Sequence, residues 1–329
     1  IGVVLVIIAQ GLGLSLPITA GAVVGGSYFG DKMSPLSDTT NLAPLAAGST
    51  LYEHIQHMFY TTVPAAIGAI ILYTVLGLNT SAAGLANSEK VDMMMANLSS
   101  IYHWNLLLLV PIIIILYGSI TKKPTIPVML ISSAVACLIG VFYQGFTFTD
   151  VFASSVSGFS MEMVKGTDTS LILPEIEKLL CRGGMNSMQE TILLILCAFS
   201  FAGIIARAGC LDVILEHLMH VVKTRFTLIA ATVVSTITMA LATGSDFLTI
   251  LIPGELYAPV YKKMGLAARN LSRTLEDSGT CVVALIPWSA AGAYAPGALG
   301  IATIDYLPYA FFCFFSVIMA LVCAGTGFG

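Results

Sequence analysis

Two short polar stretches, Leu36-Ser-Asp-Thr-Thr-Asn41 and Leu275-Glu-Asp-Ser-Gly-Thr280, lie in opposite halves of a very apolar chain. Each combines carboxylates with hydroxyl side chains in a setting from which water is largely excluded. Ionisable side chains are costly in hydrocarbon, so those inside membrane proteins commonly mark a pathway for ions. Matching interruptions in the two halves of such a chain are typical of the binding site of a secondary transporter.

The composition places the chain in a lipid bilayer. Of its 329 residues, 57% are hydrophobic and 10% are charged, whereas an average soluble domain has about 25% charged residues. The net charge of −4 is dispersed, without a basic patch or tail, which argues against a nucleic-acid partner. The seven cysteines have no CxxC spacing, so we interpret them as packing residues. Because the chain opens within an apolar run, we expect an N-terminal part of the native protein to be absent.

Helices of about 20 apolar residues can cross a bilayer. Five runs meet this length, and four other segments are interrupted by glycine, proline or polar residues. Irregular backbone at membrane depth is stable only when it is buried in protein or lines a cavity. We therefore predict an all-α polytopic membrane protein with broken helices and re-entrant hairpins around an internal site. The crossing runs are 57–77, 101–119, 126–143, 188–206 and 306–324, and the interrupted segments are 1–29, 31–48, 226–261 and 273–300.

The two halves of the chain resemble each other. In each half a glycine precedes a tyrosine by seven residues, a Leu-x-Asp string follows, and an apolar run closes the half. Chance similarity between membrane helices is the alternative. We predict residues 1–149 as a first repeat with its connecting helices, 150–187 as a polar connecting segment, and 188–329 as a second, inverted repeat. The matching residues are Gly21, Tyr28, Leu36 and Asp38 in the first half and Gly254, Tyr261, Leu275 and Asp277 in the second.

Charge placement supports inversion. Nine of the 14 Lys and Arg residues lie in three short connections, Lys122-Lys123, 207–225 and 262–273, which the positive-inside rule places in the cytoplasm. Segment 226–261 then has to fold back near residues 243–246, because both of its ends are basic. Tracing the chain backwards puts residues 78–100 and Asp31-Lys32 outside, so the two halves have opposite topology. Under this topology Lys32 is an exception to the charge rule, and Asp31 is expected at the interface.

The stretch Ser37-Asp38-Thr39-Thr40-Asn41 offers carboxylate, hydroxyl and amide oxygens at short spacing. Hard cations prefer such oxygen ligands, so the stretch suits Na⁺. The same residues also suit the N-cap of a helix, and the two roles are compatible.

The stretch Glu276-Asp277-Ser278-Gly279-Thr280 has two adjacent carboxylates. Carboxylates crowded in a low dielectric hold a proton more readily than they do in water. One of them could exchange protons near neutral pH while the other stays charged for a cation, and antiport requires such competition for one site. The alternative interpretation pairs Glu276 or Asp277 with Arg269 or Arg273 at the cytoplasmic surface.

Asp246 lies at the break expected in segment 226–261 and is a further candidate for ion binding or proton transfer. Capping of a half-helix is the alternative for this residue. The sequence has no P-loop, Rossmann glycine pattern, HExxH or nucleophile elbow, so enzyme classes and ATP-driven pumping lack support. We therefore predict a protein that is not an enzyme and needs no cofactor besides its transported ions.

Three stretches make the chain similar to the NhaC-type Na⁺/H⁺ antiporter family of the ion-transporter superfamily. They are residues 19–44, Arg182-Gly-Gly-Met-Asn-Ser187, and 275–280 together with Ile286-Pro-Trp288. The resemblance implies a polytopic inner-membrane carrier with inverted repeats and re-entrant hairpins that exchanges Na⁺ for H⁺. Relatives of this family exchange malate for lactate with Na⁺ and H⁺, and carriers of the superfamily are often homodimers. No motif separates the simple antiporter from the carboxylate exchanger.

We thus expect a multi-pass secondary antiporter of the bacterial or archaeal cytoplasmic membrane that exchanges Na⁺ for H⁺. A Na⁺/H⁺-coupled antiporter of small carboxylates such as malate and lactate is the alternative, and a channel or an intramembrane enzyme is the alternative from another class. Glu276 or Asp246 is the predicted proton carrier. The predicted Na⁺ ligands are Asp38, Thr40, Asn41, Asp277, Ser278 and Thr280, with Ser37 and Thr39 as further oxygen donors.

Overall fold

The chain is helical throughout the computed structural model, which describes residues 2–35, 37–79, 88–121, 123–164, 172–181, 183–209, 213–214, 217, 220 and 222–328. Within these ranges the backbone forms α-helices, short 3₁₀ helices and one π-helix, and no β-strand. The predicted all-α class is therefore confirmed. Leu36, Lys122 and Arg182 lie outside the described residues, as does the stretch 80–87 of the predicted outer loop.

Long apolar helices form where the apolar runs predicted them. By length and composition, three described helices can cross a membrane, or five if each of two bent pairs counts as one span. Three predicted runs are confirmed as helices with slightly shifted ends, and a fourth, 306–324, is bent by 53° ahead of Phe311, where its long helix begins. These helices are α4 (Leu51–Asn79), α7 (Thr125–Phe142), α10 (Gln189–Arg207) and α18 (Phe311–Thr326).

The predicted run 101–119 is wrong in one respect, because a sharp bend interrupts it. Helix α5 (Ser88–Ile101) ends at the start of the run, and a 3₁₀ turn (η1, Leu106–Leu109) leads into α6 (Val110–Ile120). The two arms meet at 90°. The side chain of Asn105 accepts a hydrogen bond from the backbone N–H of Leu107 (3.2 Å), and such a cap starts a new helix.

The predicted hairpin over 226–261 is confirmed as two packed helices, α12 (Arg225–Thr243) and α13 (Asp246–Lys263). They run antiparallel, since the hydroxyl of Thr232 pairs with Tyr261 (3.2 Å) and that of Ser235 with Tyr257 (2.8 Å). Gly244 ends α12 with a φ of 61°, a conformation that favours glycine. Ser245 then caps α13, and this turn places Asp246 in the first turn of the returning helix.

The two polar stretches also lie at helix interruptions. In the first, α2 (Leu16–Lys32) ends and α3 (Asp38–Ala47) begins, with residues 33–37 between them. In the second, α14 (Ala268–Leu275) continues as a π-helix (η5, Glu276–Thr280) before the short α15 (Cys281–Val283). Single π-helical turns within α-helices are frequent at functional sites.

Two buried apolar clusters hold these interruptions in place. One joins α1 (Gly2–Gly11), α2, α4, α15 and α18, and the other joins α3, α12, α13 and α14. The polar stretches lie between the two clusters, so packing on both sides fixes their position. Helix α2 approaches the 3₁₀ turn η6 (Leu307–Tyr309) closely at Gly21, where a Cβ would lie 2.6 Å from the Tyr309 carbonyl carbon.

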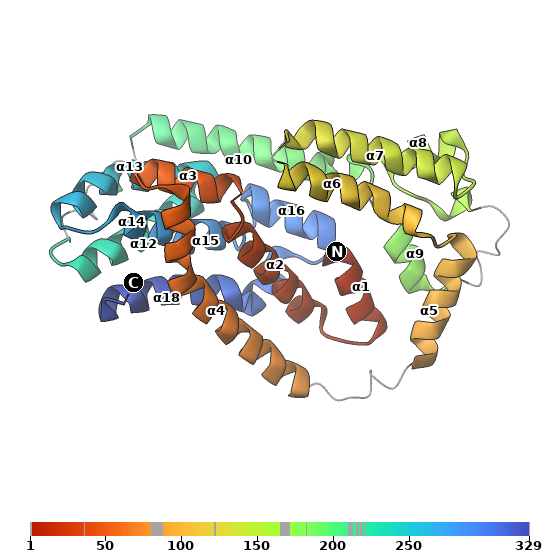
Figure 1. The fold of residues 1–329 in the computed structure, drawn as a ribbon, viewed down its shortest axis with the longest axis horizontal. Coiled ribbons are helices and arrows are strands. Elements are labelled where there is room, and N and C mark those ends of the chain that lie inside the picture. Colours follow the sequence, from red (N-terminus) through yellow and green to blue (C-terminus); the bar gives the residue numbers. More distant parts are fainter. Residues whose placement is uncertain are drawn as a thin grey trace.

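The remaining helices gather at the other end of the molecule (Figure 1). Helices α5 to α9 lie there, away from α12, α13 and α14, while α16 (Ala290–Leu299) lies near α1. The connecting segment predicted as polar is partly helical. It contains α8 (Phe148–Ser157), η2 (Met161–Met163), α9 (Pro174–Leu180) and η4 (Met185–Met188), and the short α17 (Thr303–Tyr306) precedes η6.

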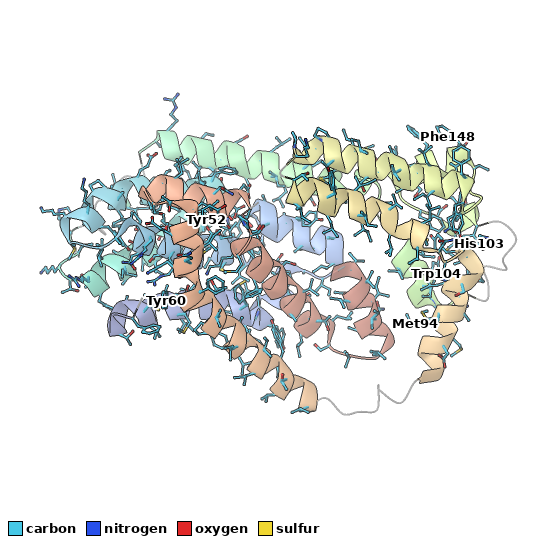
Figure 2. All side chains as sticks on the ribbon, in the orientation of Figure 1. Tyr52, Tyr60, Met94, His103, Trp104 and Phe148 are labelled. Atoms are coloured by element: carbon cyan, nitrogen blue, oxygen red, sulfur yellow. The ribbon has the colours of Figure 1, made fainter. Side chains whose placement is uncertain are left out.

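Large apolar side chains cover much of the outer surface (Figure 2). Tyr52, in the left half of the view, and Phe148, near its right end, are 69% and 74% exposed. A soluble protein rarely exposes so much apolar surface, whereas lipid tails solvate it without cost. The surface therefore fits a protein that is embedded in a bilayer.

Candidate ion-binding site

A cavity of about 390 Å³ opens where the helix interruptions meet. Three carboxylates line it, from Asp31 at the end of α2, Asp38 at the start of α3 and Asp246 at the start of α13. Helix N-termini favour the negative charges of Asp38 and Asp246, whereas Asp31 lies at the negative end of its helix. The lining of this cavity is Ser27, Tyr28, Asp31, Asp38, Thr39, Asp246 and Thr280, so no described Lys, Arg or His belongs to it.

The hydroxyl of Thr39 connects this cavity to the π-helix. Its Oγ1 lies 3.3 Å from Asp31 Oδ2, 3.1 Å from Glu276 Oε1 and 3.0 Å from Ser37 Oγ. A hydroxyl has one proton to donate, so it can donate to only one of the two carboxylates at a time. Four oxygens from three segments of the chain, counting that of Thr39, thus meet around this hydroxyl.

Glu276 and Thr280, both in the π-helix, each have one side-chain oxygen without a described hydrogen-bond partner. Glu276 is fully buried, and its Oε2 has no hydrogen-bond partner among the described residues. Thr280, at the other end of the π-helix, is 1% exposed, and its Oγ1 also lacks a described partner. Buried polar groups are normally hydrogen-bonded, so these two atoms are candidate positions for binding a proton or an ion.

Asp277 faces away from this cavity into a separate ion pair. Its Oδ1 accepts hydrogen bonds from Lys32 Nζ, from Thr61 Oγ1 (2.9 Å) and from Ser316 Oγ (3.2 Å). Its Oδ2 lies 3.9 Å from Arg273 Nε, which makes no hydrogen bond to it. Asp277, Lys32 and Arg273 are each at most 1% exposed. The two buried cations of this region therefore both face one carboxylate.

The predicted site residues thus fall into separate groups. Asp38, Thr39, Asp246 and Thr280 line the acidic cavity, and Ser37 and Glu276 contact Thr39. No described hydrogen bond or ion pair joins Asp38 to Asp277.

The other predicted oxygen ligands make hydrogen bonds within the protein. The hydroxyl of Thr40 donates to the carbonyls of residues 31 and 32 (3.2 Å each) and so caps the end of α2. The Asn41 amide donates to the carbonyls of residues 35 and 37. The hydroxyl of Ser278 donates to the Thr274 carbonyl and pairs with Thr236 (2.6 Å each).

Asp31 and Lys32 belong to the site, although neither was among the residues predicted for it. Both lie in the last turn of α2, where Asp31 lines the acidic cavity and Lys32 is fully buried. The available signal was their position directly after an apolar helix and before a polar stretch. The hydroxyls of Thr61 and Ser316 stand alone within apolar runs, so sequence reasoning had no way to pair them with Asp277.

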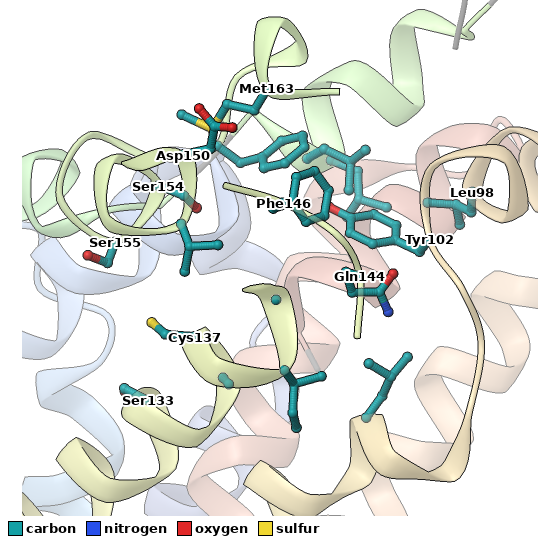
Figure 3. A pocket seen from close by; sticks show the side chains of 18 of the residues that line it. Leu98, Tyr102, Ser133, Cys137, Gln144, Phe146, Asp150, Ser154, Ser155 and Met163 are labelled. Carbon is teal, nitrogen blue, oxygen red and sulfur yellow. The ribbon is translucent and has the colours of Figure 1, made fainter. Parts of the chain in front are cut away.

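A larger cavity, of about 790 Å³, lies between α5, α7, α8 and α9 (Figure 3). Its lining is mainly apolar, and its described carboxylate, Asp150, accepts a hydrogen bond from Thr147. It therefore has one described carboxylate, against the three of the acidic cavity. Among the described residues, no group of three or more His, Cys, Asp or Glu side chains is arranged to hold a metal ion.

Residues 26–328 match the Na⁺/H⁺ antiporter family. This chain belongs to that family. The family resemblance predicted from the polar stretches is confirmed, and membership implies a multi-pass membrane transporter. The antiporter-family chain is 47% identical to an uncharacterized Na⁺/H⁺ antiporter of Haemophilus influenzae, over 100% of this chain and 70% of that protein.

Two further relatives are named for different transport activities, one for Na⁺/H⁺ exchange and one for exchange that also involves malate and lactate. The chain is 39% identical to the Na⁺/H⁺ antiporter NhaC of Alkalihalophilus pseudofirmus, over 100% of this chain and 69% of that protein. It is 28% identical to the malate-2H⁺/Na⁺-lactate antiporter of Bacillus subtilis, over 99% and 68%.

Proposed function

We propose that this antiporter-family chain exchanges Na⁺ for H⁺ across the cytoplasmic membrane of a bacterium or archaeon, with the acidic cavity as its ion site. One observation carries the proposal: Asp31, Asp38 and Asp246 line this cavity without a described cationic side chain, while the buried cations Lys32 and Arg273 face Asp277. The cavity carboxylates are left to bind protons or cations from solution. The Na⁺/H⁺ antiporters among the relatives support the same exchange.

The oxygens around Thr39 are the proposed ligands of Na⁺. Asp31 Oδ2, Glu276 Oε1 and Ser37 Oγ all lie within 3.3 Å of its hydroxyl, and carboxylate and hydroxyl oxygens suit a hard cation. Asp38 and Thr280 line the approach to this cluster. The proposal keeps Asp38, Ser37, Thr39 and Thr280 from the sequence analysis and adds Asp31. Asp277 is not included as a ligand because Lys32 occupies its Oδ1.

Glu276 is the proposed proton carrier. An ionised carboxylate that is fully buried and partly unpaired is costly, so the protonated form is favoured when no cation is bound. Na⁺ arriving between Asp31 and Glu276 compensates the charge, and the proton then leaves. The two ions therefore compete for the same carboxylate, which couples their movements. Asp246 lines the same cavity and is the proposed path by which the proton reaches solution.

We also propose that the two halves are inverted repeats and that the α12–α13 hairpin is re-entrant. The interruption before α3 brings Asp38 to the cavity from the first half, and the hairpin turn brings Asp246 from the second. Sites formed by broken helices from two halves are typical of carriers with alternating access. The π-helix at 276–280 interrupts the helix between α14 and α15, and we propose that this segment changes conformation when the site alternates between the two sides of the membrane.

Exchange of small carboxylates is the second candidate, and the malate-2H⁺/Na⁺-lactate antiporter among the relatives is what favours it. An anionic substrate needs cationic groups or helix N-termini, and the acidic cavity repels it.

The assembly that we propose is a homodimer in the lipid bilayer, because carriers of the superfamily are often homodimers.

The proposal is tested with the full-length protein in proteoliposomes that contain a pH-sensitive dye. Na⁺ alone is added first, then Na⁺ with malate or lactate, and choline replaces Na⁺ in the control. We expect proton movement with Na⁺ alone and none with choline. Proton movement only in the presence of the organic acid would contradict the proposal and establish the carboxylate exchanger.

A further inference from the structure

The ammonium group of Lys32 binds oxygen atoms from two helical segments, and a hydroxyl from a third segment binds the same carboxylate oxygen. Its Nζ donates to Asp277 Oδ1 and to Ser316 Oγ (2.7 Å). Thr61 Oγ1 lies 2.9 Å from the same carboxylate oxygen. Lys32, Asp277, Thr61 and Ser316 are all fully buried. These four side chains come from α2, η5, α4 and α18, so the pair ties the first half of the chain to the second.

A carboxylate with two hydroxyls is also the kind of oxygen cage that binds an alkali metal ion. The hydroxyl of Thr61 can donate either to Asp277 or to the Met58 carbonyl (3.1 Å), and in both cases a lone pair stays available for a cation. Ser316 likewise accepts from Lys32 while it lies 3.2 Å from Asp277. We infer that Lys32 is a tethered cation that fills a latent Na⁺ site formed by Asp277, Thr61 and Ser316.

The other groups near this cage do not replace the ammonium. Arg273 approaches the opposite oxygen of Asp277, at 3.9 Å and without a hydrogen bond. Glu276, Cys281 and Cys313 are also buried in this region and supply no positive charge. Without Lys32 the carboxylate would keep only Arg273 as a cationic neighbour, at 3.9 Å and without a hydrogen bond, and a buried ion pair that loses its hydrogen-bonded partner is strongly destabilised. A dehydrated Na⁺ held by the three oxygens is the compensation that the cage offers.

This assignment gives Lys32 a function in ion coupling. While its ammonium is in place, Asp277 needs no ion from solution, and only the acidic cavity takes a transported cation. The number of Na⁺ ions bound per chain is then one. This consequence rests on the proposed function, whereas the latent site itself does not.

The test measures thermal unfolding of the full-length protein in NaCl and in choline chloride at equal ionic strength. Lys32→Met keeps the apolar stem and removes the ammonium. At a Na⁺ concentration about tenfold above the dissociation constant, mass action should raise the unfolding midpoint of this variant by about 2 °C more than that of the wild type. Lys262→Met, at an exposed position of α13, is the matched control and should behave as the wild type.

A second variant keeps the result decisive if Lys32→Met is difficult to fold. Lys32→Met combined with Asp277→Asn removes both charges of the pair and should lose the additional Na⁺ response. Folding of Lys32→Met only when Na⁺ is present would support the inference. A wild-type Na⁺ response in Lys32→Met would overturn it, as would a Lys32→Met that stays unfolded in Na⁺ while the double variant folds. Failure of the proposed function is a separate result, namely a wild-type protein that shows no Na⁺-driven proton movement.

Discussion

Replacement of Glu276 by glutamine separates the transport function of this carboxyl group from its structural one. Glutamine has nearly the same shape, and its Oε1 can still accept the hydrogen bond from Thr39 (3.1 Å). Its Nε2 would occupy the position of Oε2, which already has no described partner. One unpaired buried polar atom therefore replaces another, and the free energy of unfolding should change by less than about 1 kcal/mol.

The effect on exchange should be much larger. A hydrogen bond or ligand contact to a charged group contributes about 1.5–3 kcal/mol more than none, and about 3 kcal/mol corresponds to a factor of about 150. Glu276→Gln also removes the proposed proton-carrying group, and the loss of proton affinity adds to the loss of cation affinity. We therefore expect Na⁺-driven proton movement to fall at least about 100-fold.

The assay is dye-monitored exchange in proteoliposomes, together with the thermal unfolding midpoint of each purified variant. Glu255→Gln is the matched control, because Glu255 is exposed on α13 and does not line the acidic cavity. It should exchange as the wild type does. A Glu276→Gln variant that exchanges within about threefold of the wild-type rate would refute the assignment of Glu276.

Two further predictions concern the acidic cavity and the packing behind it. Asp246→Asn removes one cavity carboxylate and should raise the half-saturating Na⁺ concentration about tenfold, the equivalent of about 1.4 kcal/mol of lost attraction. Asp305→Asn, at an exposed position, should leave the value unchanged, and equal shifts in both variants would contradict a specific role. Gly21→Ala puts a Cβ 2.6 Å from the Tyr309 backbone and should lower the unfolding midpoint. Gly26→Ala, in the same helix with no atom within 4 Å, should keep or raise it, so a loss in both would count against the packing of α2.

The helices were predictable because apolar run length is a local property. Runs such as 126–143 leave no alternative to a helix in a bilayer, and α7 (Thr125–Phe142) follows that prediction closely. The hairpin of α12 and α13 was also predictable, since charge placement at its two ends required a return. The 90° bend before α6 was not, because it depends on one side-chain cap at Asn105.

The candidate site was predictable in part, for a physical reason. Asp38 and Asp246 stood out because each is a carboxylate next to hydroxyls at a helix interruption. The pairing of Asp277 with Lys32 was not predictable, because Lys32 lies 245 residues away along the chain and its neighbours in the sequence suggest a residue at the membrane interface. Long-range pairing of two buried charges is decided by how helices pack, and the sequence pattern of each helix alone does not specify it.

The central claim is that Na⁺ and H⁺ compete for the carboxylates around Thr39, those of Asp31 and Glu276. Its most direct test is the pH dependence of the half-saturating Na⁺ concentration. The measurement uses wild-type proteoliposomes at a series of pH values with the same pH on both sides. If one proton competes with one Na⁺, the half-saturating Na⁺ concentration should rise by up to about tenfold for each unit of acidification, while the maximal rate at saturating Na⁺ stays constant. A half-saturating concentration that does not change with pH, with only the maximal rate changing, would contradict the claim.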